Sequence, residues 1–121
     1  MSGLDSLKIY QMAETLEIDI YEVTKEFPVE EKYGSSNQIR RSSASVSNNI
    51  AEGYTRHGYA EKIRYMYIAK GEAEETKRNL LRSAKKGFVG ELVANGLSHR
   101  YTDLLKAISG YIGFIKKKST K

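Results

Sequence analysis

The segment from residue 38 to residue 53 limits what this chain can fold into more than any other stretch. Its sequence, QIRRSSASVSNNIAEG, fits a helix with one apolar side, because a turn of about 100° per residue brings Ile39, Val46 and Ile50 together with Ser43. The two other sides are polar and mostly small. One carries Arg41, Ser45, Asn48, Asn49 and Glu52, and the other carries Arg40, Ala44, Ser47 and Ala51.

Serine and asparagine are indifferent helix formers, so a helix surrounded by water gains nothing from so many of them. One interpretation is a serine-rich surface helix. We prefer a second one, in which the helix is packed on two sides, by its own bundle and by a neighbouring subunit. A buried charge needs a partner, so we expect Glu52 to pair with an arginine of another helix or subunit. The predicted oligomer interface consists of Arg41, Ala44, Ser45, Asn48, Asn49 and Glu52.

The same segment is part of a resemblance to a known family. The residues that carry it are Tyr33-Gly34, Gln38-Ile39-Arg40-Arg41-Ser42, Asn49-Ile50-Ala51-Glu52-Gly53 and Arg56. Together they resemble the signature of the 23S rRNA intervening-sequence proteins, which are small bacterial four-helix-bundle proteins. The family's first and third helices are similar to Ile9-Tyr10-Gln11-x-Ala13 with residues 21–28, and to Ala69-Lys70-Gly71-x-Ala73-x-Glu75. The chain departs from the family at Glu72 and Glu74, where serine and a small or apolar residue are common.

The resemblance implies an all-α fold, an antiparallel up-and-down four-helix bundle that tends to form a homopentamer. Relatives act as accessory factors that bind a reverse transcriptase and nucleic acid, and the family has no established enzymatic activity. The implied partners are therefore further copies of this chain, RNA or another nucleic acid, and a nucleic-acid-processing enzyme. The resemblance defines a fold better than it defines a function.

The spacing of apolar residues predicts helices over residues 5–27, 35–54, 59–86 and 90–117 of a single domain. Asp5 or Ser6 is expected to cap the first helix, and Ser35-x-x-Gln38 is expected to form a capping box at the start of the second. Gly87 should end the third helix, and Gly71 within it predicts close approach of a neighbouring backbone, as do Gly96, Gly110 and Gly113 in the fourth.

Core residues follow from the same spacing. In the first helix they are Ile9, Met12, Ala13, Leu16, Ile20, Val23 and Phe27. In the third they are Ile63, Met66, Tyr67, Ala73, Leu80, Leu81 and Ala84, with Lys70 and Lys77 reaching from this face to water. In the fourth they are Leu92, Asn95 or Gly96, His99, Leu104, Leu105, Ile108, Tyr111, Ile112 and Ile115.

Charge is distributed unevenly along the chain. Residues 1–34 hold three basic and eight acidic side chains, whereas the remainder holds 17 basic and seven acidic ones, within a net charge of +5. The asymmetry indicates either complementary charge across a packed interface or a basic face directed at phosphates. Glu74 and Arg78, one helical turn apart, offer a salt bridge.

The candidate nucleic-acid-binding residues form two groups. Arg40, Arg41, Arg56, Lys62 and Arg64 are expected around one end, and Arg78, Arg82, Lys85 and Lys86 at the other, with Tyr54, Tyr59, Tyr65 and Tyr67 interspersed. Basic groups release counterions from phosphates, and tyrosines stack on unpaired bases. We expect a homo-oligomer, of five copies by the resemblance, that binds RNA as an accessory protein. The alternative is an adaptor that docks on a reverse transcriptase or other polymerase without touching nucleic acid itself.

Several functional classes lack support in the sequence. The chain has no cysteine and only two histidines without a repeated ligand spacing, so we expect neither a metal site nor a cofactor. No glycine-rich phosphate loop or nucleophile elbow is present, so we expect no catalytic residue and no enzyme. We also expect no secretory signal and no membrane partner, which together favour the cytoplasm.

Overall fold

Helices form almost the whole chain in a computed structural model that describes residues 3–120. In order they are α1 (Gly3–Ser6), α2 (Lys8–Thr24), the 3-10 helix η1 (Val29–Glu31), α3 (Ser35–Thr55), α4 (Tyr59–Lys85) and α5 (Glu91–Ser119). The described residues contain no strand. The predicted all-α class is therefore confirmed.

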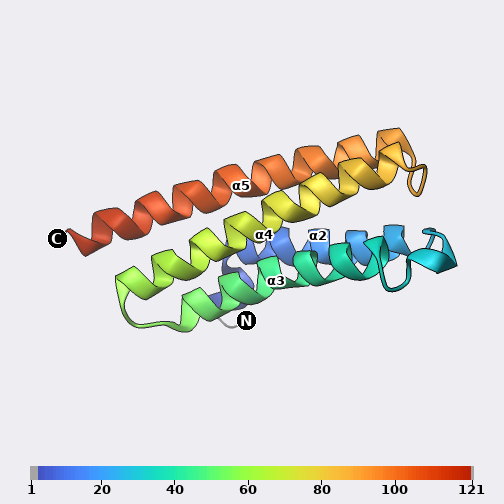
Figure 1. Cartoon of the computed structure of the whole chain (residues 1–121). Helices are drawn as coiled ribbons and strands as arrows, with labels where there is room; N and C mark the ends of the chain where they lie inside the picture. Colours follow the sequence, from blue (N-terminus) through green and yellow to red (C-terminus); the bar gives the residue numbers. More distant parts are fainter. Residues whose placement is uncertain (1–2, 121) are drawn as a thin grey trace.

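The four long helices lie side by side and are joined by short connections (Figure 1). α2 packs on α3, α3 on α4 and α4 on α5, and α5 also contacts α2. An ion pair joins this last pair of helices, because Arg100 of α5 lies 2.7 Å from the carboxylate of Asp19 on α2. A single apolar cluster draws residues from all four helices. None of the described helices is both long enough and apolar enough to cross a membrane.

The predicted core of the first two long helices is confirmed. Five of the seven residues expected in the first helix are buried, and Met12 and Val23 are half-buried against them. Ile39, Ser43, Val46 and Ile50 of α3 are all buried. These stripes consist mainly of large aliphatic residues spaced three or four apart, which is the pattern that burial of one helix face produces.

The ends of the first two helices differ from the prediction. Leu7 has an extended backbone at the start of α2, so Asp5 and Ser6 lie in the separate helix α1 and do not cap α2. The capping box at Ser35 is also wrong. Gly34 occupies the N-cap position without a side-chain cap, and the backbone N–H of Ser35 donates instead to Glu31 Oε1, 3.1 Å away. This hydrogen bond lowers the pKa of Glu31.

The predicted inner faces of the third and fourth helices are partly wrong. Tyr67 is exposed, and Lys77 donates to the hydroxyl of Thr102, 2.8 Å away, instead of reaching water. Leu92 is 89% exposed. Asn95, Gly96 and His99 are exposed as well. The face of α5 that is buried in their place carries Ala94, Leu97, Ser98 and Tyr101. Leu92 is two residues, or about 200°, from Ala94, so it projects to the opposite side.

The glycines also behave differently from one another. Gly87 has φ +81° and ends α4 as predicted, with the N–H of Phe88 donating to the carbonyl of Ser83 at 2.9 Å. Among the described residues, a Cβ at Gly71, Gly96, Gly110 or Gly113 would meet nothing within 4 Å outside its own turn of helix. Close backbone approach within the chain occurs instead at Gly53, where α3 meets α4.

Candidate nucleic-acid interface

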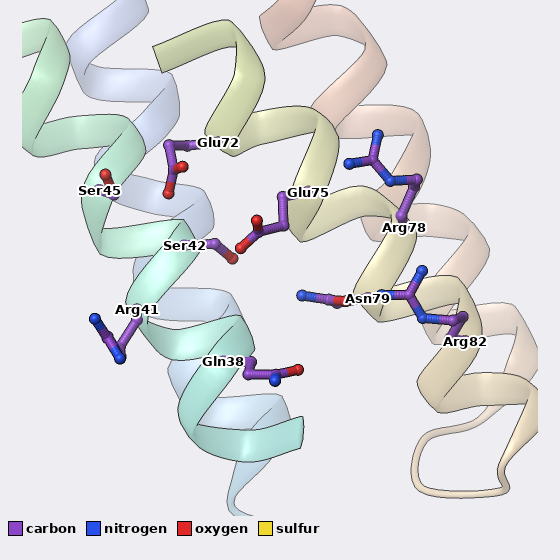
Figure 2. A pocket seen from close by; sticks show the side chains of 9 residues that line it. All are labelled: Gln38, Arg41, Ser42, Ser45, Glu72, Glu75, Arg78, Asn79 and Arg82. Carbon is purple, nitrogen blue, oxygen red and sulfur yellow. Dashed lines mark hydrogen bonds between the residues drawn. The ribbon is translucent and has the colours of Figure 1, made fainter. Parts of the chain in front are cut away.

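A polar groove of about 710 Å³ runs between α3 and α4 (Figure 2). The residues that line it are Gln38, Arg41, Ser42 and Ser45 of α3, and Glu72, Glu75, Arg78, Asn79 and Arg82 of α4. All nine side chains are polar or charged. The groove therefore suits a charged partner better than an apolar one.

Small residues hold α3 and α4 together beneath this groove. The hydroxyls of Ser42 on α3 and Thr76 on α4 are 2.7 Å apart, and both are buried. Each hydroxyl also lies near a carbonyl of its own helix, Thr76 Oγ1 at 2.9 Å from that of Glu72 and Ser42 Oγ at 3.3 Å from that of Ile39, so either can donate the hydrogen bond between them. The helix backbones can approach closely at this level, and the longer side chains above form the walls.

Three arginines and two glutamates line these walls, so the lining carries a small net positive charge. Arg41 is exposed and points away from α4 in Figure 2. Arg78 is 60% exposed and comes no closer than 4.0 Å to Glu74, a pairing that was predicted and that contributes at most a few tenths of a kcal/mol. Arg82 donates to the amide oxygen of Asn79. Glu72 and Glu75 are the two acidic residues lining the groove.

The structure regroups the predicted basic residues. Arg41 lies in the groove with Arg78 and Arg82, and not at the end of the molecule that holds Arg56. Lys85 and Lys86 are exposed where α4 ends, so the groove continues into a basic helix terminus.

Arg40 has a different environment from the other basic candidates. Its Nε donates to Thr24 Oγ1 at 2.6 Å, and its guanidinium carbon lies 4.4 Å from the centre of the Tyr21 ring. Both contacts are with α2. Arg40 is half-buried and stabilises the packing of α3 on α2, so little of its charge faces the groove.

Arg56, Lys62 and Arg64 lie together at the opposite end, as predicted for these three. Arg56 donates to Glu52 at 2.6 Å and to the hydroxyl of Tyr65 at 2.9 Å. Lys62 donates to the backbone carbonyl of Tyr54 at 2.8 Å. Arg64 donates to Glu61 at 3.1 Å, and this hydrogen bond lowers the pKa of Glu61.

The expected partner of Glu52 is therefore wrong for the isolated chain. Its partner is Arg56, one turn further along at the C-terminal end of α3, and not an arginine of another helix. The i,i+4 spacing makes this local pair easy to form. Both side chains are about half exposed, so neither charge requires a partner from elsewhere.

The predicted oligomer interface lies on the outer face of α3. Arg41, Asn48 and Glu52 are exposed, and Ala44, Ser45 and Asn49 are half-buried. Asn49 donates to the backbone and hydroxyl oxygens of Ser45, at 2.8 and 3.0 Å, which flattens this face. Other serines of α3 are buried by the chain itself: Ser42 against α4, and Ser47 against α2, where it hydrogen-bonds Glu17. The chain's own packing thus accounts for part of the small-residue pattern.

The two histidines lie apart on the surface. His57 follows α3 and His99 lies in α5, and both are exposed. Within residues 3–120, no group of three or more His, Cys, Asp or Glu side chains is arranged to hold a metal ion.

The fold and the groove define a class: an all-helical protein whose long helices enclose one apolar core and present a charged groove between two of them. The chain belongs to the 23S rRNA-intervening sequence protein family, whose sequence pattern matches residues 5–110. This confirms the resemblance described above. No curated protein matches the sequence.

A solved structure has the same fold. It is a protein of unknown function from the S23 ribosomal protein family of Bacteroides thetaiotaomicron VPI-5482, which is 21% identical to this chain. The TM-score is 0.77, and the match covers 86% of this chain and 97% of the other. At this identity, the likeness establishes the fold alone.

Proposed function

We propose that this protein is a non-enzymatic, cytoplasmic homo-oligomer that binds RNA through a basic surface as an accessory factor. The basic surface consists of Arg41, Arg78, Arg82, Lys85 and Lys86, along the α3–α4 groove and the end of α4. We assign the four long helices to an antiparallel up-and-down bundle. The short connections and the successive packing of neighbouring helices support this assignment.

The observation that carries the proposal is the exposure of these five cations in one region. Arg78 has only a distant carboxylate neighbour, and Arg82 is hydrogen-bonded to a neutral amide. Cations of this kind can neutralise phosphates and release their counterions, which is the main source of affinity for nucleic acid. The residues that line the groove include no aromatic side chain, so the groove suits the RNA backbone better than the bases.

The proposed assembly is a pentamer built on the outer face of α3. The middle of this face carries the short side chains of Ala44, Ser45 and Asn48, which are half-buried or exposed in the single chain, so a helix of another copy has room to approach closely. In such an assembly each basic surface is repeated in every subunit. Repetition strengthens binding to a long RNA without any new contact, because the second and later contacts are intramolecular.

A titration of structured RNA at two salt concentrations tests RNA binding. We expect affinity to fall at least tenfold between about 50 and 200 mM salt, and the double variant Arg78→Gln/Arg82→Gln to bind more weakly with a shallower salt dependence. Lys106→Gln, which removes an exposed charge from α5, is the matched control. Absence of binding at low salt, or an affinity that does not change with salt concentration, would contradict the proposal.

The alternative function is that of an adaptor docking on a reverse transcriptase or another polymerase. The surface of α2 and the turn after it favours this function, because Glu14 and Glu22 are exposed on α2 and Glu26 is exposed just beyond its end, where they complement a basic partner. A pull-down with a purified reverse transcriptase tests this function. Binding that survives nuclease treatment and is lost in the double variant Glu14→Lys/Glu26→Lys would favour the adaptor. Retention that nuclease abolishes would select the RNA-binding function instead.

A further inference from the structure

A second pocket, of about 620 Å³, lies at the end of the molecule where α3 ends, α4 begins and α5 ends. In Figure 1 this is the end that carries the α3–α4 connection and the C-terminus. We call it the end pocket. The residues that line it are Leu7, Tyr54, Thr55, Arg56, His57, Tyr59, Lys62, Tyr111, Phe114, Ile115 and Lys118.

Aromatic rings distinguish the end pocket from the groove. Four tyrosine or phenylalanine rings line it beside the exposed imidazole of His57, and two of the four are open to solvent: Tyr59 is 42% exposed and Phe114 is 52% exposed. Phe114 is held against Tyr111, with ring centres 6.3 Å apart. Tyr54 serves packing, because it fills the space beside Gly3 so closely that a Cβ there would collide with its hydroxyl. No residue of the described chain fully covers the rings of Tyr59 and Phe114. Their flat apolar faces are therefore partly open to a ligand.

The charge of the end pocket is uniformly positive among its lining residues, since none of them is acidic. The ammonium group of Lys118 lies 4.7 Å from the centre of the Phe114 ring. The ammonium group of Lys62 donates a hydrogen bond to a neutral backbone carbonyl, so this contact does not cancel its positive charge. Arg56 contributes less, because Glu52 lies 2.6 Å from its guanidinium outside the lining.

We propose that the end pocket binds an unpaired nucleotide of RNA. The base stacks on Tyr59 or Phe114, and Lys62 and Lys118 neutralise the adjoining phosphates. Exposed rings beside cations recognise bases only when these are not stacked in a duplex. This inference rests on the proposed RNA binding. It adds that the groove binds the RNA backbone, whereas the end pocket binds unpaired nucleotides.

The test uses a short single-stranded RNA that contains 2-aminopurine, whose fluorescence is quenched by stacking, and a blunt RNA duplex as competitor. We expect the wild-type protein to quench the probe and the duplex to compete poorly. The double variant Tyr59→Leu/Phe114→Leu should bind the single strand about tenfold more weakly, because loss of one base–aromatic stack weakens binding about 5- to 150-fold, while duplex binding is unchanged. Lys118→Gln should weaken binding but retain quenching.

Tyr33→Leu is the matched control, since Tyr33 is 85% exposed but lies outside the end pocket. Both altered rings in the double variant are solvent-exposed, and thermal unfolding by circular dichroism verifies that it folds. Equal competition by duplex, or wild-type affinity in the double variant, would overturn the inference and leave RNA binding by the groove intact. Failure of both RNAs to bind at low salt would overturn both proposals.

Discussion

Two glycines within long helices have opposite surroundings. A Cβ at Gly53 would lie 2.9 Å from Met66 Cε and from Tyr65 Cβ, and 3.3 Å from the carbonyl oxygen of Lys62. A Cβ at Gly71 would meet nothing within 4 Å among the described residues outside its own turn of helix. The sequence predicted close approach at the second position, because a glycine within a helical pattern does not reveal which face its neighbours occupy.

We expect Gly53→Ala to lower the free energy of unfolding by up to about 2 kcal/mol. Overpacking costs about 1–3 kcal/mol, because Tyr65 Cβ belongs to the framework of α4 and cannot move aside alone. Alanine regains roughly 1 kcal/mol of this cost, because it favours the helix over glycine. Gly71→Ala is the matched control and should raise the free energy of unfolding by up to about 1 kcal/mol. Urea unfolding measures both. A destabilising Gly71→Ala would show that another copy contacts this position.

At Tyr101 we expect removal of a hydroxyl group to raise the free energy of unfolding. Its hydroxyl is buried and has no hydrogen-bond partner among the described residues, and burial raises the pKa of the phenol. We expect Tyr101→Phe to raise the free energy of unfolding by about 1 kcal/mol, since it removes an unsatisfied polar group. Tyr65→Phe removes a hydroxyl that accepts a hydrogen bond from Arg56 and should be destabilising by a similar amount. A destabilising Tyr101→Phe would reveal a partner for its hydroxyl.

At the scale of helices, the sequence predicted the faces of α2 and α3 well and those of α4 and α5 less well. α2 and α3 bury regular aliphatic stripes. α4 buries Met66, Ala73 and Leu80 as predicted. It also buries Thr76, Asn79 and Ser83, whose burial depends on hydrogen-bond partners and close packing that a hydrophobic pattern does not contain. In α5 the choice of Leu92 as the first core residue shifted the predicted stripe away from Ala94 and Leu97.

The start of α3 depends on a carboxylate from the preceding connection. Hydrogen bonds from the backbone and hydroxyl of Ser35 lower the pKa of Glu31, with Lys86 adding to the effect. A carboxyl whose pKa is lower in the folded state stabilises the fold above its unfolded pKa, and this stabilisation is lost as the pH falls through the folded pKa. We therefore expect Glu31→Gln to be less stable than the wild-type protein at neutral pH, and the difference to disappear in acid.

Thermal unfolding at neutral and acidic pH measures this difference. Glu30→Gln is the control, because Glu30 is the adjacent exposed glutamate in the same 3-10 helix. A Glu31→Gln variant that matches the wild-type protein at neutral pH would show that the carboxylate does not stabilise the start of α3.

At the scale of the molecule, the sequence provided the right kinds of residue for the candidate site but placed some at the wrong end. Arg40 and Arg56 both belong to the family signature and were predicted at the same end, yet they lie about 24 Å apart along one helix, because each residue adds about 1.5 Å. Arg41 lines the same groove as Arg78 and Arg82 only because α3 packs along α4 in this register. The end pocket was predicted in part, through Arg56, Lys62 and Tyr59. Its other wall, with Phe114 and Lys118, was missed, because the tertiary fold alone brings α5 beside Tyr59.

The outer face of α3 links the fold to the proposed function, because the repeated basic surface requires an assembly of several copies. Light scattering after size-exclusion chromatography measures the mass of the wild-type protein directly. We expect a mass close to five times the 13.7 kDa of one chain, with Ala44, Ser45 and Asn48 protected from solvent. A mass of one chain at micromolar concentration, with these residues accessible, would contradict the assembly and the repeated RNA-binding surface built on it.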